Sequence, residues 1–590
     1  MQVTSRCGRL ASARLPGYRS RSPPSTSASH EPDTHPARAH RDDHQQRSPR
    51  VTPRNSRISD QSRRVALARS NAGARGYSSS GGARGAPPLA IGLVGALAGL
   101  KLLTHLLVIL FTPYGIHRDS FLYMAMGRHL RFWSMDFPPG IALLSNAARA
   151  VFGDTLFAVL IFPALAGTAL VVLAALIARE LGGGRMAQGL AALAVLASPL
   201  FLRSASLFQP VVLDQLWWTL ALLAVVRIAR GAGAGSWVLL GVACGLGLLT
   251  KFSIVLLAVP LAVALLLTPL RRAYLTRWPW AALAIALVLG SPSIAGQVRL
   301  GYPLREQMRV LQSAQLERVT PAAFAAEQLL YGPGTLLALA GLVALLFWPR
   351  LRPFRAVGWT AVGVLIVLLA LRGKGYYFGP MYPALYAAGA VGLAALPGRG
   401  APRLAGVAVV LMVAYMCITL PLGLPILRPP EMARYSRALG VTTVVQTNRG
   451  EVGELPQDYA DMLGWKEQVR AVAAAYHALS PEEQADAVVL ADNYGEAGAI
   501  DFYGPRYGLP PAICPSGSYW FFGPGPKPGN VLLSLGPEPE ALREHYATVR
   551  LVGRFDHPWM VSEERQRAIV VSTDPHRTLQ QLWPTIAGRN

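Results

Sequence analysis

Long apolar segments follow one another from about residue 89 to residue 427, with short polar loops between them. An α-helix of such residues can cross a hydrocarbon core about 30 Å thick. The pattern therefore predicts an α-helical polytopic membrane domain over residues 89–427, with about eleven transmembrane helices. The predicted spans are 89–112, 155–178, 187–202, 211–229, 236–250, 252–268, 279–297, 329–348, 356–371, 378–396 and 404–424.

The loop after the first span, residues 113–154, has a helical pattern of its own. Leu122, Met126 and Trp133 recur at helical spacing, with Arg128 and Arg131 on the other side. This spacing predicts an amphipathic helix over 120–133 that lies in the membrane interface. A second such helix is predicted over 138–152.

Residues 428–590 change to a mixture of short apolar and polar segments, which predicts a small soluble α/β domain. The predicted strands are 441–446, 486–491, 530–535, 547–553 and 567–572, and the predicted helices are 459–479, 495–503 and 538–546.

Composition supports this division and adds a basic N-terminal tail. Hydrophobic residues make up 52% of the chain and charged residues 15%, against about 25% charged in an ordinary soluble domain. Residues 1–88 are rich in Arg, Ser, Pro and Gly and are expected to be disordered. They are a cytoplasmic tail, an organellar transit peptide or the product of an upstream start-codon error.

The net charge of +24 is spread over this tail and the loops between spans. It forms no single basic face, so nucleic acid is not an expected partner. Arginines concentrate in alternate loops, which marks those loops and the N-terminus as cytoplasmic. The loops 113–154, 203–210, 298–328 and 372–377 and the domain 428–590 are then extracytoplasmic, in a multi-pass protein of the cell (inner) membrane.

The four cysteines show no metal-binding spacing, and a structural zinc site is not expected.

Two acids at the outer membrane boundary are candidate catalytic groups, because charge there is costly. Asp119 opens the first predicted interfacial helix, and Asp214 lies just inside the fourth span. In one cavity they could serve as a general base and an orienting partner or metal ligand. The alternatives are a helix N-cap for Asp119 and a structural hydrogen bond for Asp214.

Two of the five lysines, Lys251 and Lys374, lie at the outer ends of spans. Lysine is a compact donor suited to phosphate, and Tyr376 and Tyr377 follow Lys374 directly. Acids, lysines and tyrosines at one face fit a phosphorylated lipid substrate. The alternatives are lysines that extend to the interface and an aromatic belt.

Four segments carry a family resemblance: HRDSFLYMAMGRHL, MDFPPG, LFQPVVLDQLWW and LRGKGYYFGPMYPAL. The weaker segment GLGLLTKFS adds to it. With these segments the chain resembles the GT-C fold membrane glycosyltransferases, and most closely glycosyltransferase family 39. That family includes protein O-mannosyltransferases and the lipid A aminoarabinose transferase.

The resemblance implies a transferase that moves a hexose or pentose from a polyprenyl-phosphate donor to a lipid, glycan or protein acceptor, with inversion. It implies Asp119 and Asp214 as catalytic acids and Lys374, Tyr376 and Tyr377 as donor-phosphate ligands. Lys251 and Arg118 join this donor-phosphate set. Ser120 follows Asp119 where many members carry a second acid. We therefore assign no metal ligand here, and a divalent metal stays open as a cofactor.

The segments LPQDYADMLGW and LADNYGEAGAIDFYGPRYGLP resemble the extracytoplasmic domain of a bacterial subgroup, in which Asp492, Asn493, Glu496 and Asp501 could shape an acceptor site. The alternative is a capped helix after a strand. Two other functions stay open for the whole chain. A transporter or lipid flippase would show internal repeats, which are not found, and a scaffold has no need of the acids and lysines together.

Overall fold

The computed structural model describes residues 85–440 and 450–586. The predicted N-terminal tail, apart from its last few residues, and the predicted strand 441–446 lie outside this part. The helices before residue 440 have the following bounds: α2 Ile91–Phe111, α3 Arg118–Arg128, α4 Gly140–Phe152, α5 Leu156–Glu180, α6 Arg185–Ala197, α7 Pro199–Ser204, α8 Pro210–Ala229, α9 Ala234–Thr250, η1 Phe252–Ile254, α10 Val255–Leu266, η2 Pro269–Leu275, α11 Trp278–Arg299, α12 Pro303–Ala314, η3 Leu316–Arg318, α13 Pro321–Leu329, α14 Gly334–Phe347, η4 Pro349–Phe354, α15 Arg355–Ala370, η5 Gly375–Met381, α16 Tyr382–Ala394, α17 Gly400–Gly423 and α18 Pro429–Leu439.

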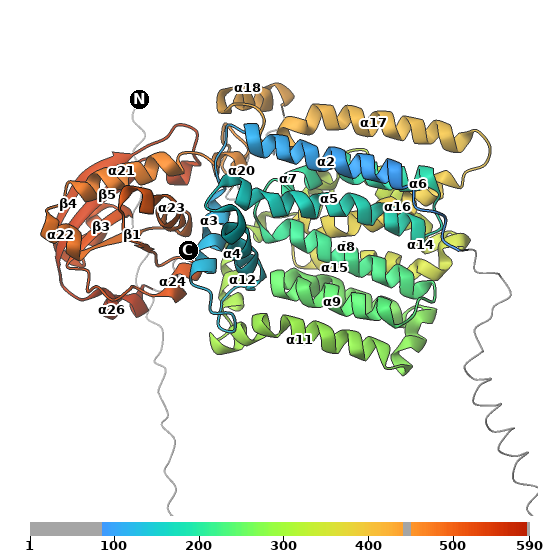
Figure 1. Ribbon diagram of the computed structural model, residues 1–590, viewed down its shortest axis with the longest axis horizontal. Helices are drawn as coiled ribbons and strands as arrows, with labels where there is room; N and C mark the ends of the chain where they lie inside the picture. Colours follow the sequence, from blue (N-terminus) through green and yellow to red (C-terminus); the bar gives the residue numbers. More distant parts are fainter. Residues whose placement is uncertain (1–84, 441–449, 587–590) are drawn as a thin grey trace, which may run out of the picture. The chain divides into compact units, whose positions relative to one another are not determined.

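These helices form a bundle (Figure 1), in which each of the eleven predicted spans coincides with a helix or a pair of helices. Within the described residues, six helical stretches are long and apolar enough to cross a membrane, and eight are if each of two bent pairs counts as one. The outer helices expose apolar side chains: on α17, Val407 is 55% and Val410 65% exposed. Such surfaces suit contact with lipid rather than with water.

Two predicted spans are not straight. The predicted span 329–348 covers the bend between α13 and α14, whose axes differ by 111° around Tyr331-Gly332-Pro333. The predicted span 187–202 is divided into α6 and α7 at Ser198-Pro199. Proline cannot donate the helical hydrogen bond, so it favours such breaks. The breaks matter because α13 and α7 both lead to residues of the candidate site.

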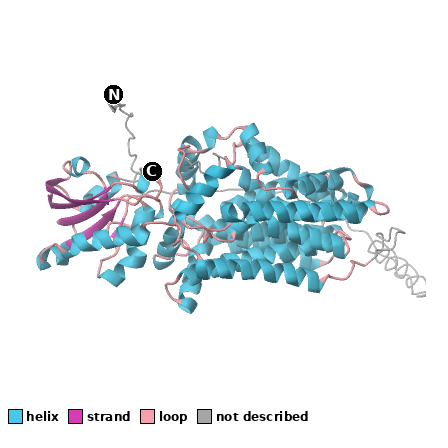
Figure 2. Cartoon of the chain, turned by 90° about the horizontal axis from the view of Figure 1, so that it is seen from above, coloured by secondary structure: helices cyan, strands magenta, loops and turns pink. Residues whose placement is uncertain are grey.

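The C-terminal part contains a mixed five-stranded sheet, shown in magenta in Figure 2. The strand order is β2-β1-β3-β5-β4; β2, β1 and β3 are parallel, and β5 is antiparallel to both β3 and β4. Its elements are α20 Gln457–Ala460, α21 Trp465–His477, α22 Pro481–Asp486, β1 Ala487–Ala491, α23 Tyr494–Tyr503, η6 Gly504–Tyr507, β2 Ala512–Ile513, α24 Ser518–Phe522, β3 Val531–Gly536, α25 Pro539–Leu542, β4 Tyr546–Phe555, η7 Ser562–Glu564, β5 Arg567–Pro575, α26 Leu579–Leu582 and η8 Trp583–Thr585.

The predicted α/β domain and its strands at β1, β3, β4 and β5 are therefore confirmed. One predicted helix is wrong in extent. Residues 459–479 form α20 and α21 rather than one helix, because Gly464 between them has a φ of +77°, a left-handed value that interrupts an α-helix. The interruption matters because Asp461 lies in this turn. The predicted helix 538–546 is shorter as well, since β4 already begins at Tyr546.

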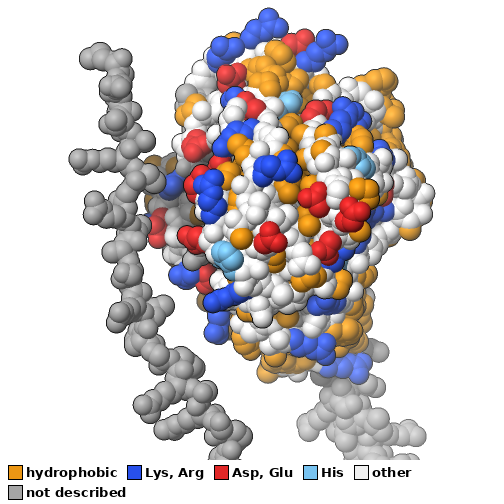
Figure 3. Space-filling view, turned by 90° about the vertical axis from the view of Figure 1, so that its left-hand side faces the viewer, with side chains coloured by type: hydrophobic (Ala, Val, Ile, Leu, Met, Phe, Trp, Pro, Cys, Tyr) orange, Lys and Arg blue, Asp and Glu red, His pale blue; other side chains and the backbone are white. Residues whose placement is uncertain are grey.

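Alternation along the strands covers both faces of the sheet. Val489 and Leu533 pack with α21 and α23 on one face, whereas Val488 and Leu532 pack with α25 and α26 on the other. The face turned toward the viewer in Figure 3 carries acidic and basic side chains side by side with apolar ones. On this face basic side chains are interspersed with acidic ones, and the expectation about the net charge of the whole chain stays a prediction.

The hydrophobic core of the C-terminal part continues into the first loop of the membrane domain. Phe121 and Met124 of α3 belong to the same buried cluster as Trp465 of α21 and Ile500 of α23. The expectation of an interfacial helix over 120–133 is therefore wrong. Helix α3 ends at Arg128, and its apolar side chains pack into protein rather than into the bilayer surface.

Candidate active site

Asp119 lies in the first turn of α3, and its carboxylate is held from two sides. The N-cap of α3 is His117, whose Nδ1 accepts the Asp119 backbone N–H at 3.1 Å. The Asp119 side chain is therefore free of capping and accepts two other hydrogen bonds. Tyr494 donates its hydroxyl to Oδ1 at 2.9 Å, and Gln209 donates Nε2 to Oδ2 at 2.8 Å. Asp119 is therefore not the N-cap of α3. Its carboxylate is instead fixed by hydrogen bonds from the N-cap residue of α8 and the first residue of α23.

Asp214 is buried on α8, at 5% exposure. Its Oδ1 accepts the Trp218 indole N–H at 2.9 Å, and its Oδ2 accepts the Ser253 hydroxyl at 2.7 Å. Ser253 lies in η1, at the reversal between α9 and α10 that Lys251 opens. The acid therefore ties α8 to the segment that carries Lys251.

The two acids contact different partners along one helix. Gln209, which contacts Asp119, is the N-cap of α8, and Asp214 comes five residues later. Five residues of α-helix span about 7.5 Å. The expectation that both carboxylates act in one cavity stays a prediction.

The two lysines and two tyrosines predicted as phosphate ligands come together at η5. The Lys251 ammonium lies 5.0 Å from the ring centroid of Tyr377 and 6.0 Å from that of Tyr376. Burial lowers the pKa of Lys374, while nearby Tyr377 and, more weakly, the acids Asp458, Glu327 and Asp119 oppose this change. A cation from the reversal between α9 and α10 thus lies beside two phenols of η5, from segments more than 120 residues apart.

Glu327 supports this cluster and was not predicted from the sequence. Its Oε2 accepts the backbone N–H of Gly375 at 2.9 Å, and its Oε1 accepts the Tyr331 hydroxyl at 2.6 Å. The carboxylate therefore fixes the start of η5, directly after Lys374. The sequence signal is an acid within the largely apolar helix α13.

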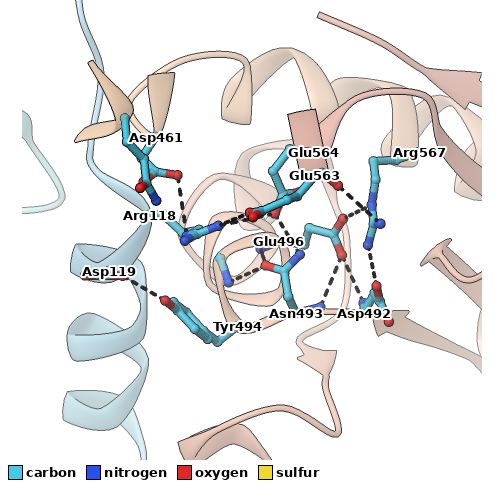
Figure 4. A network of polar contacts seen from close by, with 12 residues as sticks. Arg118, Asp119, Asp461, Asp492, Asn493, Tyr494, Glu496, Glu563, Glu564 and Arg567 are labelled. Atoms are coloured by element: carbon cyan, nitrogen blue, oxygen red, sulfur yellow. Dashed lines mark hydrogen bonds and ion pairs between the residues drawn. The ribbon is translucent and has the colours of Figure 1, made fainter. Parts of the chain in front are cut away.

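Arg118 has contacts other than those expected of a phosphate ligand. Its guanidinium lies 3.5 Å from carboxylate oxygens of Asp461 and Glu563 and 3.8 Å from Glu564 (Figure 4). It also lies 5.8 Å from the centroid of the Tyr494 ring. Arg118 thus turns toward the C-terminal domain, and its donor-phosphate role stays a prediction.

Three of the predicted acceptor residues stabilise the start of α23, and the fourth, Asp501, accepts hydrogen bonds from Ala512 and Tyr519. Asn493 caps this helix by accepting the N–H groups of Gly495 and Glu496 at 2.9 and 3.2 Å. Glu496 is fully buried and pairs with Arg567 at 2.6 Å, and Asp492 pairs with the same guanidinium at 2.6 Å. These contacts correspond to the capped-helix alternative, and an acceptor role stays a prediction.

His117, Asp458 and Asp461 each place one potential metal-ligand atom within 4.8 Å of the others. The donor chemistry does not fit a resident divalent metal. Because His117 Nδ1 accepts the Asp119 N–H, a neutral ring carries its proton on Nε2 and has no lone pair there for a metal. Arg203 already lies 2.6 Å from Asp458. The cluster is better described as an ion network, with His117 Nε2 3.7 and 3.8 Å from the two acids.

Part of the membrane domain matches a known family. Residues 136–295 match the family described as dolichyl-phosphate-mannose-protein mannosyltransferase. The chain is also 35% identical over 150 residues to undecaprenyl phosphate-alpha-4-amino-4-deoxy-L-arabinose arabinosyl transferase 1 of Pseudomonas fluorescens. That match spans 24% of this chain and about a quarter (26%) of the relative.

The similarity to solved structures covers far more of the chain. It covers 85% of this chain and all of ArnT from Cupriavidus metallidurans bound to undecaprenyl phosphate, with a TM-score of 0.54 and 18% identity. The apo structure of the same protein gives the same coverage and TM-score at 16% identity. This is the GT-C membrane fold. The predicted fold class and the predicted resemblance to family 39 are confirmed.

The GT-C fold also places the chain among multi-pass membrane proteins. At this level of identity the structural likeness speaks for the fold alone. The chemistry of this chain has to be argued from its own residues.

Proposed function

We propose that this protein is a membrane glycosyltransferase that moves a sugar from a polyprenyl-phosphate donor to an acceptor. The observation that carries the proposal is the arrangement around the start of α8. Gln209 there binds the Asp119 carboxylate, and Asp214 five residues later binds Ser253 of the segment that carries Lys251. A base near a cluster of cations is what sugar transfer from a phosphate requires.

In the proposed reaction, Asp119 takes the proton from an acceptor hydroxyl or amine. The freed electron pair attacks the anomeric carbon of the sugar. The bond between that carbon and the phosphate oxygen breaks, and its electrons leave with the polyprenyl phosphate. A single displacement of this kind inverts the anomeric centre.

Lys374, Lys251, Tyr376 and Tyr377 would stabilise the charge on the leaving phosphate. They can do so because ammonium and phenol groups donate hydrogen bonds to phosphate oxygens. Asp214 would act on Lys251 through Ser253, whose hydroxyl donates a hydrogen bond of 2.7 Å to the Asp214 carboxylate. Its part in the reaction is thus to position the phosphate site. No step is assigned to a metal.

The transferred sugar would be a pentose or a hexose. A relative is named as an arabinosyl transferase, and the matching family is named for mannose transfer. The partners would be the polyprenyl-phosphate-linked sugar, the bilayer, and a lipid, glycan or protein acceptor. Loop arginines support an inner-membrane location with the N-terminus in the cytoplasm and with transfer on the extracytoplasmic face. None of the contacts described above favours a transporter or flippase.

The test uses the full chain in proteoliposomes with radiolabelled polyprenyl-phosphate sugars and a membrane acceptor extract. We expect label to move from the donor to an acceptor, and Asp119→Asn to abolish this movement. Asp154→Asn is the matched control. Asp154 follows α4 in the same first loop, and its contact is an ion pair with Arg149.

Unchanged transfer by Asp119→Asn would overturn the mechanism. Passage of a solute across the bilayer, without consumption of any lipid-linked sugar, would overturn the function itself.

A further inference from the structure

The C-terminal domain touches the proposed base directly, through α23. This helix packs closely on α3, and its glycines Gly495 and Gly498 both face α3. A Cβ on Gly498 would lie 2.5 Å from Phe121 Cβ and 2.9 Å from its backbone carbonyl carbon, so only glycine fits there. Phe121 itself is fully buried, and its ring lies 5.8 to 5.9 Å from the rings of Trp465, Phe502 and Tyr503.

The packing fixes where Tyr494 lies. Tyr494 is the first residue of α23, directly after the Asn493 cap and its capping box with Glu496. The Arg118 guanidinium lies over its ring at 5.8 Å, and the same guanidinium contacts Glu563 and Glu564. Figure 4 shows the hydrogen bond that the Tyr494 hydroxyl then donates to the Asp119 carboxylate.

We propose that Tyr494 is a positioning residue for Asp119, so that the C-terminal domain completes the active site of the transferase. The proposal rests on the proposed function. Tyr494 and Gln209 donate to different oxygens of one carboxylate, at 2.9 and 2.8 Å. Two donors on opposite oxygens stop the carboxylate from rotating about its terminal torsion. Each oxygen keeps a second lone pair, so the group can still accept the proton of an acceptor.

Orientation of this kind affects the rate more than the binding of the donor. A hydrogen bond to a charged group stabilises it more strongly than a bond between neutral groups. Without the hydrogen bond from Tyr494, the carboxylate must rotate into the reacting geometry, which raises the activation free energy. The donor phosphate is bound elsewhere, by the groups around Lys374. Loss of the Tyr494 hydroxyl therefore predicts a lower kcat with little change in the KM for the donor.

The experiment compares Tyr494→Phe with Tyr503→Phe in the full chain in proteoliposomes. Tyr503 lies at the other end of α23, where its ring packs on Phe121. Both variants lose one hydroxyl from the same helix. For Tyr494→Phe we expect kcat to fall roughly 10- to 100-fold, with the donor KM within about twofold of wild type. For Tyr503→Phe we expect wild-type kinetics.

The pH profile of kcat/KM supplies a readout that packing alone would not move. Tyr494→Phe removes a donor that favours an ionised carboxylate, so the acid limb of the profile should move to higher pH. In an Asp119→Asn background, adding Tyr494→Phe should leave the activity as low as Asp119→Asn alone does, because its effect passes through the carboxylate.

Two outcomes separate this inference from the proposed function. If Asp119→Asn abolishes transfer but Tyr494→Phe behaves as Tyr503→Phe does, the positioning role is wrong and the transferase mechanism stands. If Asp119→Asn leaves transfer unchanged, the proposed mechanism falls first. An equal loss of rate in both tyrosine variants would also overturn the positioning role, since it would mark a general effect of weakened packing.

Discussion

Arg203 of α7 and Asp458 of α20 form an ion pair with a separation of 2.6 Å. The same guanidinium donates to the carbonyl oxygen of Leu422 at 2.7 Å and lies 4.5 Å from the centroid of the Tyr459 ring. It therefore joins α7, α17 and α20 at one point. Since α7 leads to Gln209 at the start of α8, this pair couples the C-terminal part to the helix that holds Asp119.

Replacement of Arg203 should loosen that coupling. Arg203→Gln leaves the Asp458 carboxylate, which is one-third exposed, without its cation. We expect a loss of about 2 kcal/mol in the free energy of unfolding, between the values for exposed and buried pairs. Denaturant unfolding in detergent, followed by tryptophan fluorescence, measures it. Arg309→Gln removes an exposed i,i+3 pair with Glu306 and should cost far less; equal losses would contradict the coupling.

Ser253→Ala tests whether Asp214 acts through the segment of Lys251. The variant removes the 2.7 Å hydrogen bond to Asp214 and frees the reversal between α9 and α10. We expect the KM for the donor to rise roughly tenfold, as for loss of a hydrogen bond to a charged group, while kcat changes less. Steady-state transfer assays at varied donor concentration separate the two constants. Ser291→Ala, on exposed α11, is the control, because its hydroxyl bonds only the local carbonyl of Val288. A fall in kcat at constant KM would argue for a direct role of Asp214 in the reaction.

Glu327→Gln tests the support of the phosphate segment. Both carboxylate oxygens of Glu327 accept hydrogen bonds, from Gly375 and Tyr331, and an amide can accept only one of them. We expect the affinity for polyprenyl phosphate to fall roughly tenfold, since a buried donor loses its partner. Binding of labelled polyprenyl phosphate in detergent measures it directly. Glu317→Gln changes an exposed acid in the same loop and should bind as wild type does. Unaltered binding by Glu327→Gln would remove Glu327 from the site.

The carboxyl of Glu564 should make the stability depend on pH. Burial, with help from the neighbouring Glu496, raises its pKa to about 8, against 4.5 for an ordinary glutamate. Between these values the folded chain keeps a proton that the unfolded chain has released. Stability therefore falls as the pH rises from about 4.5 to 8, and is constant with respect to this group above that range.

Glu564→Gln removes this titration but keeps an oxygen for the Asn493 donor. We expect the midpoint of thermal unfolding to fall less steeply between pH 5 and pH 8 in the variant than in wild type. Some slope should remain in both, because burial also raises the pKa of Asp461 to about 6. Parallel slopes in the two proteins would show that Glu564 is ionised in the fold.

Much of the fold follows from local pattern, and its departures have local causes as well. Apolar runs predict the helices of the bundle because a span must be long enough to cross the bilayer, apolar on its surface and hydrogen-bonded within itself. The errors fall where a short signal interrupts a long run: Pro199 divides one span, Pro333 bends another, and Gly464 divides a soluble helix. Predicting each interruption from the sequence would require a single Pro or Gly to override the apolar or helical pattern of the residues around it.

Only part of the candidate site could be predicted from the sequence. Lys374, Tyr376 and Tyr377 are adjacent in the chain, so a short motif could place them together. Tyr494 lies 375 residues from Asp119, and no periodicity connects them. Arg118 is predicted as a phosphate ligand, but its side chain points to the C-terminal domain. Its contact with Glu563, 445 residues away, depends on the docking of a whole domain.

The contact between Tyr494 and Asp119 has a consequence for how the protein matures. Asp119 is made early and can reach its helix bundle while most of the chain is still to be synthesised. Its second hydrogen-bond donor exists only after residue 494 has been made and the surrounding sheet has formed. If the proposed roles hold, a nascent chain would carry Asp119 without its partner Tyr494, and full activity would begin only when the C-terminal domain has folded onto the first loop.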